Sequence, residues 1–320
     1  MRKLILAWLV IPMLVIGLAL PVLADDLNTS LLESALQGDL TKVQSLIGQG
    51  ADVNLAGTDG RTPLINAAGS GNVELVKFLL ERKALINVKT KTGETPFLVA
   101  AQKGYPEIMK LFMAKSIDAK EYLPALITAV KTDKREVAEV LAEKIELKYN
   151  FEDIICLAAK YGSNGILKLF AEKGADTSRM GFDPEAKEKT TNEWSPLMFA
   201  VENNRLETVK LLVSQQPERI NDHDDNYKYP LMIASEKGNA EIVGFLLDNK
   251  AEANSLDKDN WTPMMYAAKN GRVDAVKMII AKRPGLDLNR KSHRNETALS
   301  IAIANNQTKV VEVLKAAGAK

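Results

Sequence analysis

The sequence predicts an all-α protein built as a solenoid, in which short helix pairs stack one upon the next. A nine-residue motif that contains Thr-Pro and ends in Ala-Ala occupies residues 60–68, and it recurs at 93–101 and 260–268. A second observation is the apolar residues that follow each motif at helical spacing. The pairs that end at Ala68 and Ala101 are about 33 residues apart, and a fixed period of this length indicates an array of repeats, each contacting only its neighbours.

The second Ala of the Ala-Ala pair marks the register of the whole array. The equivalent positions are Ala35, Ala68, Ala101, Val130, Ala159, Val201, Ser235, Ala268 and Ile303. The steps between them keep this period closely except in the middle of the chain, so we expect about nine repeats.

Each repeat begins with a helix whose two ends are encoded by single residues. Proline at the first helical position loses no hydrogen bond, and the hydroxyl residue before it caps the helix. The predicted caps are Thr62, Thr95, Ser195 and Thr262. A glycine then ends the helix in the left-handed conformation. The glycines are Gly38, Gly71, Gly104, Gly162, Gly238 and Gly271, and Asn204 and Asn306 take the same place in two other repeats.

The second helix of each repeat carries a buried stripe. Val73, Val76 and Leu79 show the spacing in one repeat, and Ile242, Val243 and Leu246 show it in another. A polar turn such as 257–260 follows and leads to the next repeat.

The period and the Thr-Pro-Leu and Ala-Ala boxes resemble those of the ankyrin repeat family. The resemblance covers residues 27–320, although the middle repeats are degenerate. It implies an all-α ankyrin-repeat solenoid of paired antiparallel helices with short β-hairpin fingers. It also implies that ligands contact the fingertips and the exposed end of each first helix. The last repeat, with the run 310–315, is expected to be a polar-faced cap.

Residues 1–24 differ from the rest and are typical of a secretory signal peptide. Arg2 and Lys3 precede an apolar run from Leu4 to Leu20, and Pro21-Val22-Leu23-Ala24 offers a cleavage site. The alternative is an uncleaved membrane anchor, but the run is short and contains Pro12. We therefore expect an exported protein, in a bacterial periplasm or outside the cell, whose residues 25–320 form the solenoid.

The stretch 121–193 is irregular. The markers Val130 and Ala159 each come about four residues early, and Val201 comes about nine residues late, which places an insertion within 180–193. Insertions in solenoids often lie on the binding face, but a neutral surface loop of this length is also tolerated cheaply. The sequence leaves both interpretations open.

Several departures from the family motif concern the core. The position that is usually His in ankyrin repeats, which links neighbouring repeats, is Ile65, Leu98, Cys156, Met198, Met232, Met265 or Ser300 here. The recurring methionines are expected to fill the core rather than form an adaptable surface. The single cysteine, Cys156, is expected to be a buried apolar residue rather than a reactive thiol, and no intramolecular disulfide is possible.

The sequence offers no pattern for catalysis, a cofactor or a metal. The two histidines, His223 and His293, lie far apart in the sequence, and neither zinc-ligand spacing, a nucleophile elbow nor a phosphate-binding glycine loop is present. The formal net charge is +1, and it is close to −1 without Arg2 and Lys3. This balance argues against nucleic acid as a partner.

The candidate recognition surface combines the ends of the first helices with the residues before them. Trp194, Tyr229 and Trp261 precede three consecutive helices and are expected to form a row, either as an exposed aromatic ladder or packed between fingers. The candidate protein-binding residues are Lys103, Tyr161, Trp194, Glu202, Asn203, Tyr227, Tyr229, Glu236, Lys237, Trp261, Lys269 and Asn270.

The sequence thus predicts a monomeric, non-catalytic protein-binding module that does not insert into a membrane once its signal is cleaved. The favoured role is an adaptor or protective partner of an envelope protein. A secreted effector or toxin-neutralising protein that binds a foreign or cognate target is the alternative.

Overall fold

The computed structural model describes residues 26–115, 117–145, 151–186 and 193–320, and the predicted signal peptide lies outside them. Within these ranges a helix over 26–37 is followed by seventeen α-helices and two short 3-10 helices. The α-helices are α2 (Leu40–Gly48), α3 (Pro63–Ser70), α4 (Val73–Glu81), α5 (Pro96–Lys103), α6 (Pro106–Met113), α7 (Tyr122–Lys131), α8 (Arg135–Ala142), α9 (Phe151–Tyr161), α10 (Asn164–Glu172), α11 (Pro196–Glu202), α12 (Leu206–Gln215), α13 (Pro230–Lys237), α14 (Ala240–Asp248), α15 (Pro263–Lys269), α16 (Val273–Lys282), α17 (Ala298–Ala304) and α18 (Thr308–Ala316). The 3-10 helices are η1 (Ala119–Glu121) and η2 (Pro217–Asn221).

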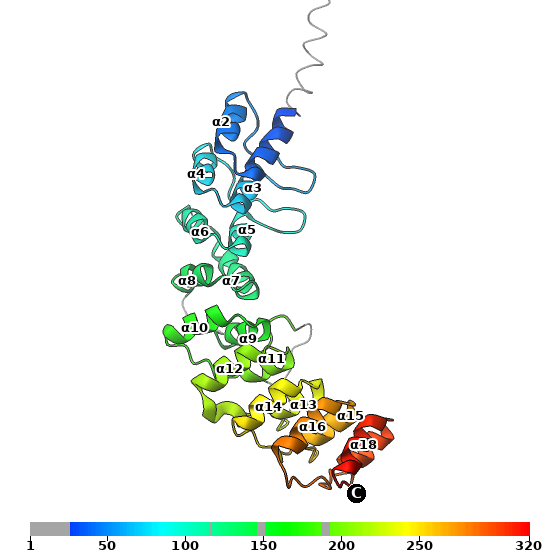
Figure 1. The fold of residues 1–320 in the computed structure, drawn as a ribbon. Helices are drawn as coiled ribbons and strands as arrows, with labels where there is room; N and C mark the ends of the chain where they lie inside the picture. The colour runs from blue at the N-terminus through cyan, green and yellow to red at the C-terminus, as the bar shows by residue number, and fades with distance from the viewer. Residues whose placement is uncertain (1–25, 116, 146–150, 187–192) are drawn as a thin grey trace, which may run out of the picture. The chain divides into compact units, whose positions relative to one another are not determined.

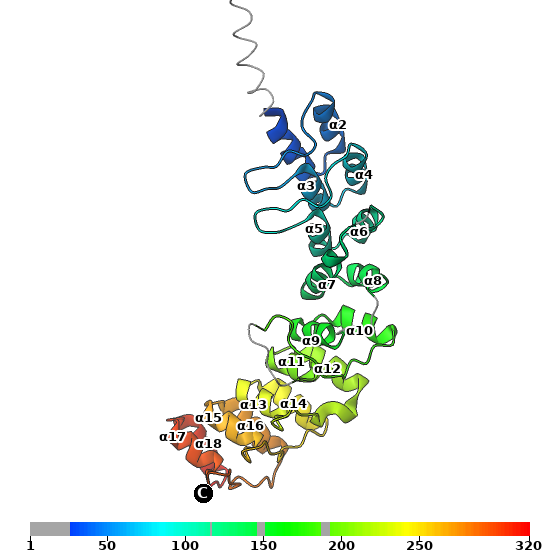
Figure 2. The same cartoon turned by 180° about the vertical axis from the view of Figure 1, so that it is seen from behind.

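These helices form consecutive pairs, which confirms the all-α repeat fold. The chain divides into two compact units, one with residues up to 129 and 136–145, the other with 130–135 and the part from 146 onward. In the second unit α9, α11, α13, α15 and α17 pack in series, with the second helix of each pair alongside (Figures 1 and 2). The first unit repeats this arrangement with α3 and α5 beside α4 and α6. The division between the units falls in the irregular stretch of the sequence.

The predicted caps are confirmed at the start of the first helices. The hydroxyl oxygens of Thr62, Thr95, Ser195 and Thr262 each accept a hydrogen bond from the backbone N–H three residues on, at 3.1–3.4 Å. Each therefore satisfies one N–H that the helix itself leaves without a partner. Thr297 does the same for α17, where Ser300 completes a capping box.

The predicted helix ends are also confirmed. All six glycines have positive φ, and Asn204 and Asn306 both adopt φ of 58° in their place. The fourth repeat uses Asp133, at φ 49°, which the sequence did not reveal. Aspartate is one of the few residues with a side chain that tolerate this conformation.

The core follows the predicted register except at the end of the array. The marker residues from Ala35 to Ala268 are all buried, and Met198, Met232, Met265 and Cys156 are at most 1% exposed. Ile303, in the last of the described repeats, is the exception, with an exposed fraction of 55%. In the run 310–315, for which a polar face was expected, Glu312 and Lys315 are exposed and Val310 and Leu314 are buried.

The fingers are turns rather than paired strands. In five of them one backbone N–H donates to the carbonyl four residues on, as from Thr90 to Glu94 at 2.9 Å. Neighbouring fingers are joined by bonds such as Lys258 N–H to the Asn226 carbonyl, at 3.1 Å. The segments on either side of each turn are too short to pair as β-strands. Within the described residues the one isolated β-bridge joins Gly181 to Trp194.

A side chain that follows the helix-ending residue links successive repeats, where the family histidine is missing. It donates a hydrogen bond to a backbone carbonyl at the end of the preceding repeat's first helix. The linked pairs are Asn72 with Gly38 (2.8 Å), Ser163 with Val130, Arg205 with Lys160 (3.1 Å), Arg272 with Glu236 (2.9 Å) and Gln307 with Lys269 (3.4 Å). These bonds help to fix each repeat on the one before it.

Candidate protein-interaction surface

All twelve candidate residues are at least partly exposed, because they lie at first-helix ends or in the segments that precede these helices. Lys103, at the end of α5, belongs to the first unit, and the other eleven belong to the second. Some of these candidate side chains bind other groups of the same chain, and others remain exposed to a partner protein.

The richest part of this surface surrounds α13 and α15. We call it the aromatic–charged cluster, and it consists of Lys228, Glu236, Asp257, Trp261, Tyr266 and Lys269. The Lys269 ammonium lies 5.4 Å from the centre of the Trp261 ring, which packs edge-on against Tyr266 at 5.3 Å. The Lys228 ammonium lies 5.2 Å from the Tyr266 ring and 2.6 Å from the Glu236 carboxylate. The cluster thus presents aromatic faces and charges of both signs.

Asp257 organises this cluster from the finger. Its carboxylate accepts the backbone N–H of Trp261 and the hydroxyl of Tyr266, both at 2.7 Å. Burial raises the pKa of the Tyr266 hydroxyl, and the hydrogen bond to Asp257 raises it further, so Tyr266 stays a neutral donor. The candidates chosen from the sequence did not include Lys228, Asp257 or Tyr266. The available signal was that Tyr266 directly precedes the Ala-Ala pair of its repeat, where the other Thr-Pro repeats carry Asn66 or Val99.

The three aromatic residues for which a row was expected, Trp194, Tyr229 and Trp261, each pack locally and keep part of their surface exposed. Trp194 packs against Phe199 at 5.6 Å, and its ring N–H donates to the Asp224 carboxylate at 3.2 Å. Tyr229 packs against His223 at 5.1 Å. Trp194 therefore also joins two fingers, so its substitution affects structure as well as any binding.

Other candidates already have partners within the chain. The amide groups of Asn203 and Asn270 donate to carbonyls of their own helices at 2.9 Å, which helps to close α11 and α15. Glu202 and Lys237 form an ion pair at 2.5 Å between neighbouring repeats. Tyr227 is 47% exposed and stacks on His223 at 4.5 Å.

The described start of the insertion, residues 180–186, covers the end of α9, where Tyr161 lies. The Tyr161 hydroxyl donates to Glu185 at 2.6 Å, and the Lys160 ammonium contacts Asp183 at 2.7 Å and Glu185 at 3.3 Å. Lys131 also contacts Glu185, at 2.7 Å. Tyr161 is thus occupied by the chain itself, unlike Lys269 in α15.

The electrostatics of this contact follow from the crowding of cations around one carboxylate. Burial alone would raise the pKa of Glu185, but hydrogen bonds from Lys131 and Tyr161 outweigh it and lower the pKa to about 2. The hydrogen bond that Tyr161 donates to Glu185 also raises the pKa of the Tyr161 hydroxyl. Glu185 is therefore a carboxylate at any physiological pH.

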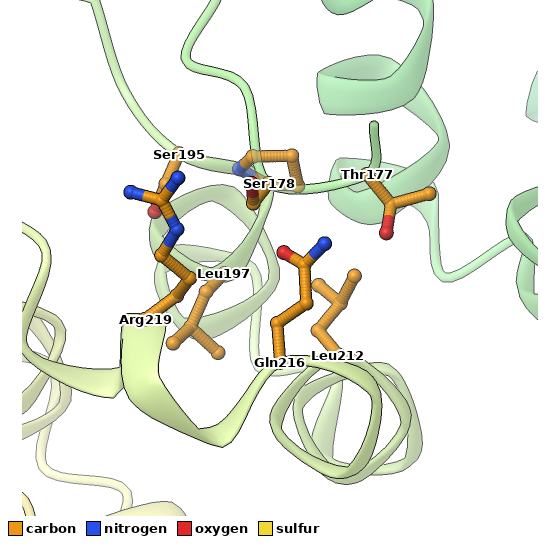
Figure 3. Close-up of a pocket in the computed structure, with 8 residues that line it drawn as sticks. Thr177, Ser178, Ser195, Leu197, Leu212, Gln216 and Arg219 are labelled. Carbon is orange, nitrogen blue, oxygen red and sulfur yellow. The ribbon is translucent and has the colours of Figure 1, made fainter. Parts of the chain in front are cut away.

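Figure 3 shows a cavity between the finger residues Thr177 and Ser178 and the side chains of Leu212, Gln216 and Arg219. Its volume of about 10 Å³ is that of roughly one water molecule. Small-molecule sites are at least tens of times larger. The cavity therefore offers room for hydration but not for a substrate.

Two further results bear on chemistry. In the described ranges no group of three His, Cys, Asp or Glu side chains is arranged to hold a metal ion. Burial raises the pKa of the Cys156 thiol, and nearby carboxylates such as Asp153 raise it further, so the thiolate is strongly disfavoured.

Across residues 26–320, apart from the short gaps, no helix has the length and apolar character that a bilayer-spanning segment requires. The predicted leader, 1–24, lies outside the part of the chain that the structure describes.

Known proteins share the repeat. The model of the family described as "Ankyrin repeats (3 copies)" matches residues 31–122, 155–257 and 231–320, more than half of the chain. The chain is 28% identical over 166 residues to the "Ankyrin repeat and KH domain-containing protein mask-1" of Caenorhabditis elegans, covering 52% of this chain and 6% of that protein. It is 25% identical over 202 residues to the "Ankyrin repeat domain-containing protein SAT10" of Stachybotrys chartarum, covering 62% and 10%.

The chain therefore matches only a small part of those two long relatives. A shorter one, the "Putative ankyrin repeat protein FPV223" of Fowlpox virus, is 30% identical over 114 residues, which are 36% of this chain and 79% of the viral protein. The regular succession of helix pairs, their caps and these matches agree, and the chain belongs to the ankyrin repeat family, whose repeats serve as protein–protein interaction modules.

Proposed function

We propose that this protein is a non-catalytic binding module of an exported compartment, where it acts as an adaptor or protective partner of an envelope protein. The observation that carries this proposal is the aromatic–charged cluster on the exposed ends of α13 and α15. Aromatic and basic side chains of this kind are the usual anchors of protein interfaces.

The cluster suits a protein partner for two reasons. Asp257 holds the Tyr266 hydroxyl and the Trp261 backbone, and the two rings pack on each other, so little conformational entropy is lost when a partner packs on them. Lys269 is exposed over Trp261, and Lys228 and Glu236 carry opposite charges near Tyr266, which favours a partner of complementary charge pattern.

The compartment is inferred from the sequence of residues 1–24, with its basic start, apolar run and cleavage site. Expression of the full chain in a bacterial host tests it. A periplasmic product with the mass of a chain that starts at Asp25 supports export with cleavage. If the full-length, uncleaved chain were found in the membrane fraction, residues 1–24 would instead be a membrane anchor. A cytoplasmic product would refute export.

Crosslinked affinity capture of the tagged chain, expressed with its own leader, tests the binding role. We expect one envelope protein to be enriched, and the variant Lys269→Glu to lose about tenfold or more of that enrichment. A second variant carries Tyr229→Ala, Trp261→Ala and Lys269→Ala, with folding checked by circular dichroism.

The matched control is Lys210→Glu on α12, a second helix, where the lysine pairs with Glu207 of the same helix at 2.8 Å. The control should bind as the wild type does. Capture that Lys269→Glu leaves unchanged would show that the cluster is not the binding surface. Enrichment of a toxin or a host protein in place of an envelope protein would favour the effector role.

A further inference from the structure

The segment Phe182-Asp183-Pro184-Glu185, here called the acidic segment, lies on the chain as a bound peptide would. Its start is fixed by the backbone bridge between Gly181 and Trp194, with both bonds at 3.0 Å, and by the Phe182 N–H, which donates to Asp153 at 2.7 Å. Its two carboxylates then reach Lys160 and Tyr161 at the end of α9.

The receiving residues occupy recognition positions. Lys160 and Tyr161 follow the marker Ala159, as Lys269 and Asn270 follow Ala268 in α15. Lys269 is exposed, whereas the Lys160 side chain is only 22% exposed because the acidic segment covers it. Lys131, of the second unit, completes the receiving surface, with its ammonium 5.5 Å from the centre of the Tyr161 ring.

We propose that Lys131, Lys160 and Tyr161 form a binding site for an acidic segment of a partner protein, and that the chain's own acidic segment occupies this site as a tethered competitor. The site takes two carboxylates separated by one residue, next to an aromatic side chain. This inference rests on the proposed protein-binding function and adds a second surface to it.

The contact has the strength expected of a competitor that can be displaced. Ion pairs near a protein surface are individually weak, and only two carboxylates take part. A short tether gives an effective concentration in the millimolar range. A partner that adds further contacts therefore displaces the acidic segment, whereas a weak acidic peptide does not.

A peptide of residues 178–186, acetylated, amidated and labelled with fluorescein, tests the proposal by anisotropy. The protein is the chain from residue 25 onward, as wild type and as Asp183→Asn with Glu185→Gln. These changes keep the size and one acceptor oxygen of each side chain and remove their charges. We expect the peptide to bind the double variant at least about tenfold more tightly than the wild type, where the site is mostly occupied.

Two controls identify the site. Lys160→Met, added to the double variant, keeps the apolar stem but removes the charge, and it should abolish binding. A peptide with Asn and Gln in place of its own Asp and Glu should not bind. Circular dichroism establishes that each variant is folded.

Equal binding to the wild type and the double variant, binding that Lys160→Met leaves unchanged, or no binding to the folded double variant would each overturn the proposal. Because the Lys269 capture experiment does not involve this site, such a failure would leave the proposed protein-binding function standing.

Discussion

At the scale of single residues, local packing decides which functional groups are available. The Lys269 ammonium is open to a partner, whereas that of Lys160 is shared by two carboxylates. Residue type and position in the repeat are the same for both. The difference arises from contacts with the insertion, which lies well beyond α9 in the sequence.

The acidic segment should detach in acid. Because folding lowers the pKa of Glu185 from 4.5 to about 2, its stabilising contribution is complete above pH 4.5 and is lost as the pH falls toward 2. In a Trp261→Phe chain starting at residue 25, the fluorescence of Trp194, which bridges Gly181, should report this change. Glu185→Gln should remove this pH-dependent change in fluorescence. Circular dichroism measured over the same pH range checks that the helices remain folded. A transition with its midpoint above pH 4.5 would contradict the lowered pKa.

The thiol of Cys156 should be inert in the folded protein. It is fully buried, and burial raises its pKa, so the reactive thiolate is scarce at pH 8. A thiol reagent such as dithionitrobenzoate should label it only in denaturant. Rapid labelling of the native chain would refute this view of the residue.

At the scale of helices, end residues and links between repeats carry the fold. Gly238 shows both effects at once. It closes α13 at φ 84°, and a methyl group at its position would come within 2.6 Å of the Arg272 side chain that reaches back from the next repeat. The glycine therefore provides both the backbone conformation and the space for the link.

Gly238→Ala should lower the free energy of unfolding by more than the roughly 1–2 kcal/mol of a left-handed alanine, because the clash with Arg272 adds to it. In an Arg272→Ala background, Gly238→Ala should lower the free energy of unfolding only by the cost of placing alanine in the left-handed conformation. Urea unfolding of the four chains forms the cycle. Equal costs in both backgrounds would show that Arg272 does not crowd this site.

The cap of α15 gives a simpler test. Thr262→Ala should cost about 1 kcal/mol of stability because the N–H of Met265 loses its acceptor, and Thr262→Ser should restore most of it. Thermal or urea unfolding measures both variants. If serine were as destabilising as alanine, the methyl group rather than the hydroxyl would be responsible.

The sequence could predict the helices and their caps because each depends on one local residue type, such as Thr62 or Gly71. It could not predict the links between repeats, because the donor varies from Asn72 to Arg272 while the acceptor is a backbone carbonyl that leaves no trace in sequence. The candidate surface was predicted by position alone. Whether a given side chain there is free, as with Lys269, or occupied, as with Tyr161, depends on long-range contacts.

At the scale of the whole molecule, the two units and the repeat architecture make stability local. In such arrays each repeat is stabilised by itself and its neighbours. A core change in one unit should therefore have little effect on repeats several places away.

Leu75→Ala in α4 and Ile279→Ala in α16 test this, since both side chains are fully buried and each change costs about 2–5 kcal/mol. In the chain from residue 25, the fluorescence of Trp194 and Trp261 reports the second unit alone. Ile279→Ala should lower the urea concentration at the midpoint of the fluorescence transition. Leu75→Ala should leave this midpoint unchanged, while the helical signal in circular dichroism begins to fall at a lower urea concentration. A shift in both probes for both variants would show that the array unfolds as a single cooperative structure.

The links between repeats have a consequence for how such a chain can change over generations. Each link needs a suitable donor on one repeat, while the preceding repeat supplies a backbone carbonyl, which any residue has, and the glycine that leaves room for the donor. Duplication, loss or exchange of a whole repeat that keeps this glycine therefore leaves the link itself intact. The array can be lengthened or given a new surface in single genetic events, and the insertion with its acidic segment is one element that such an event could add.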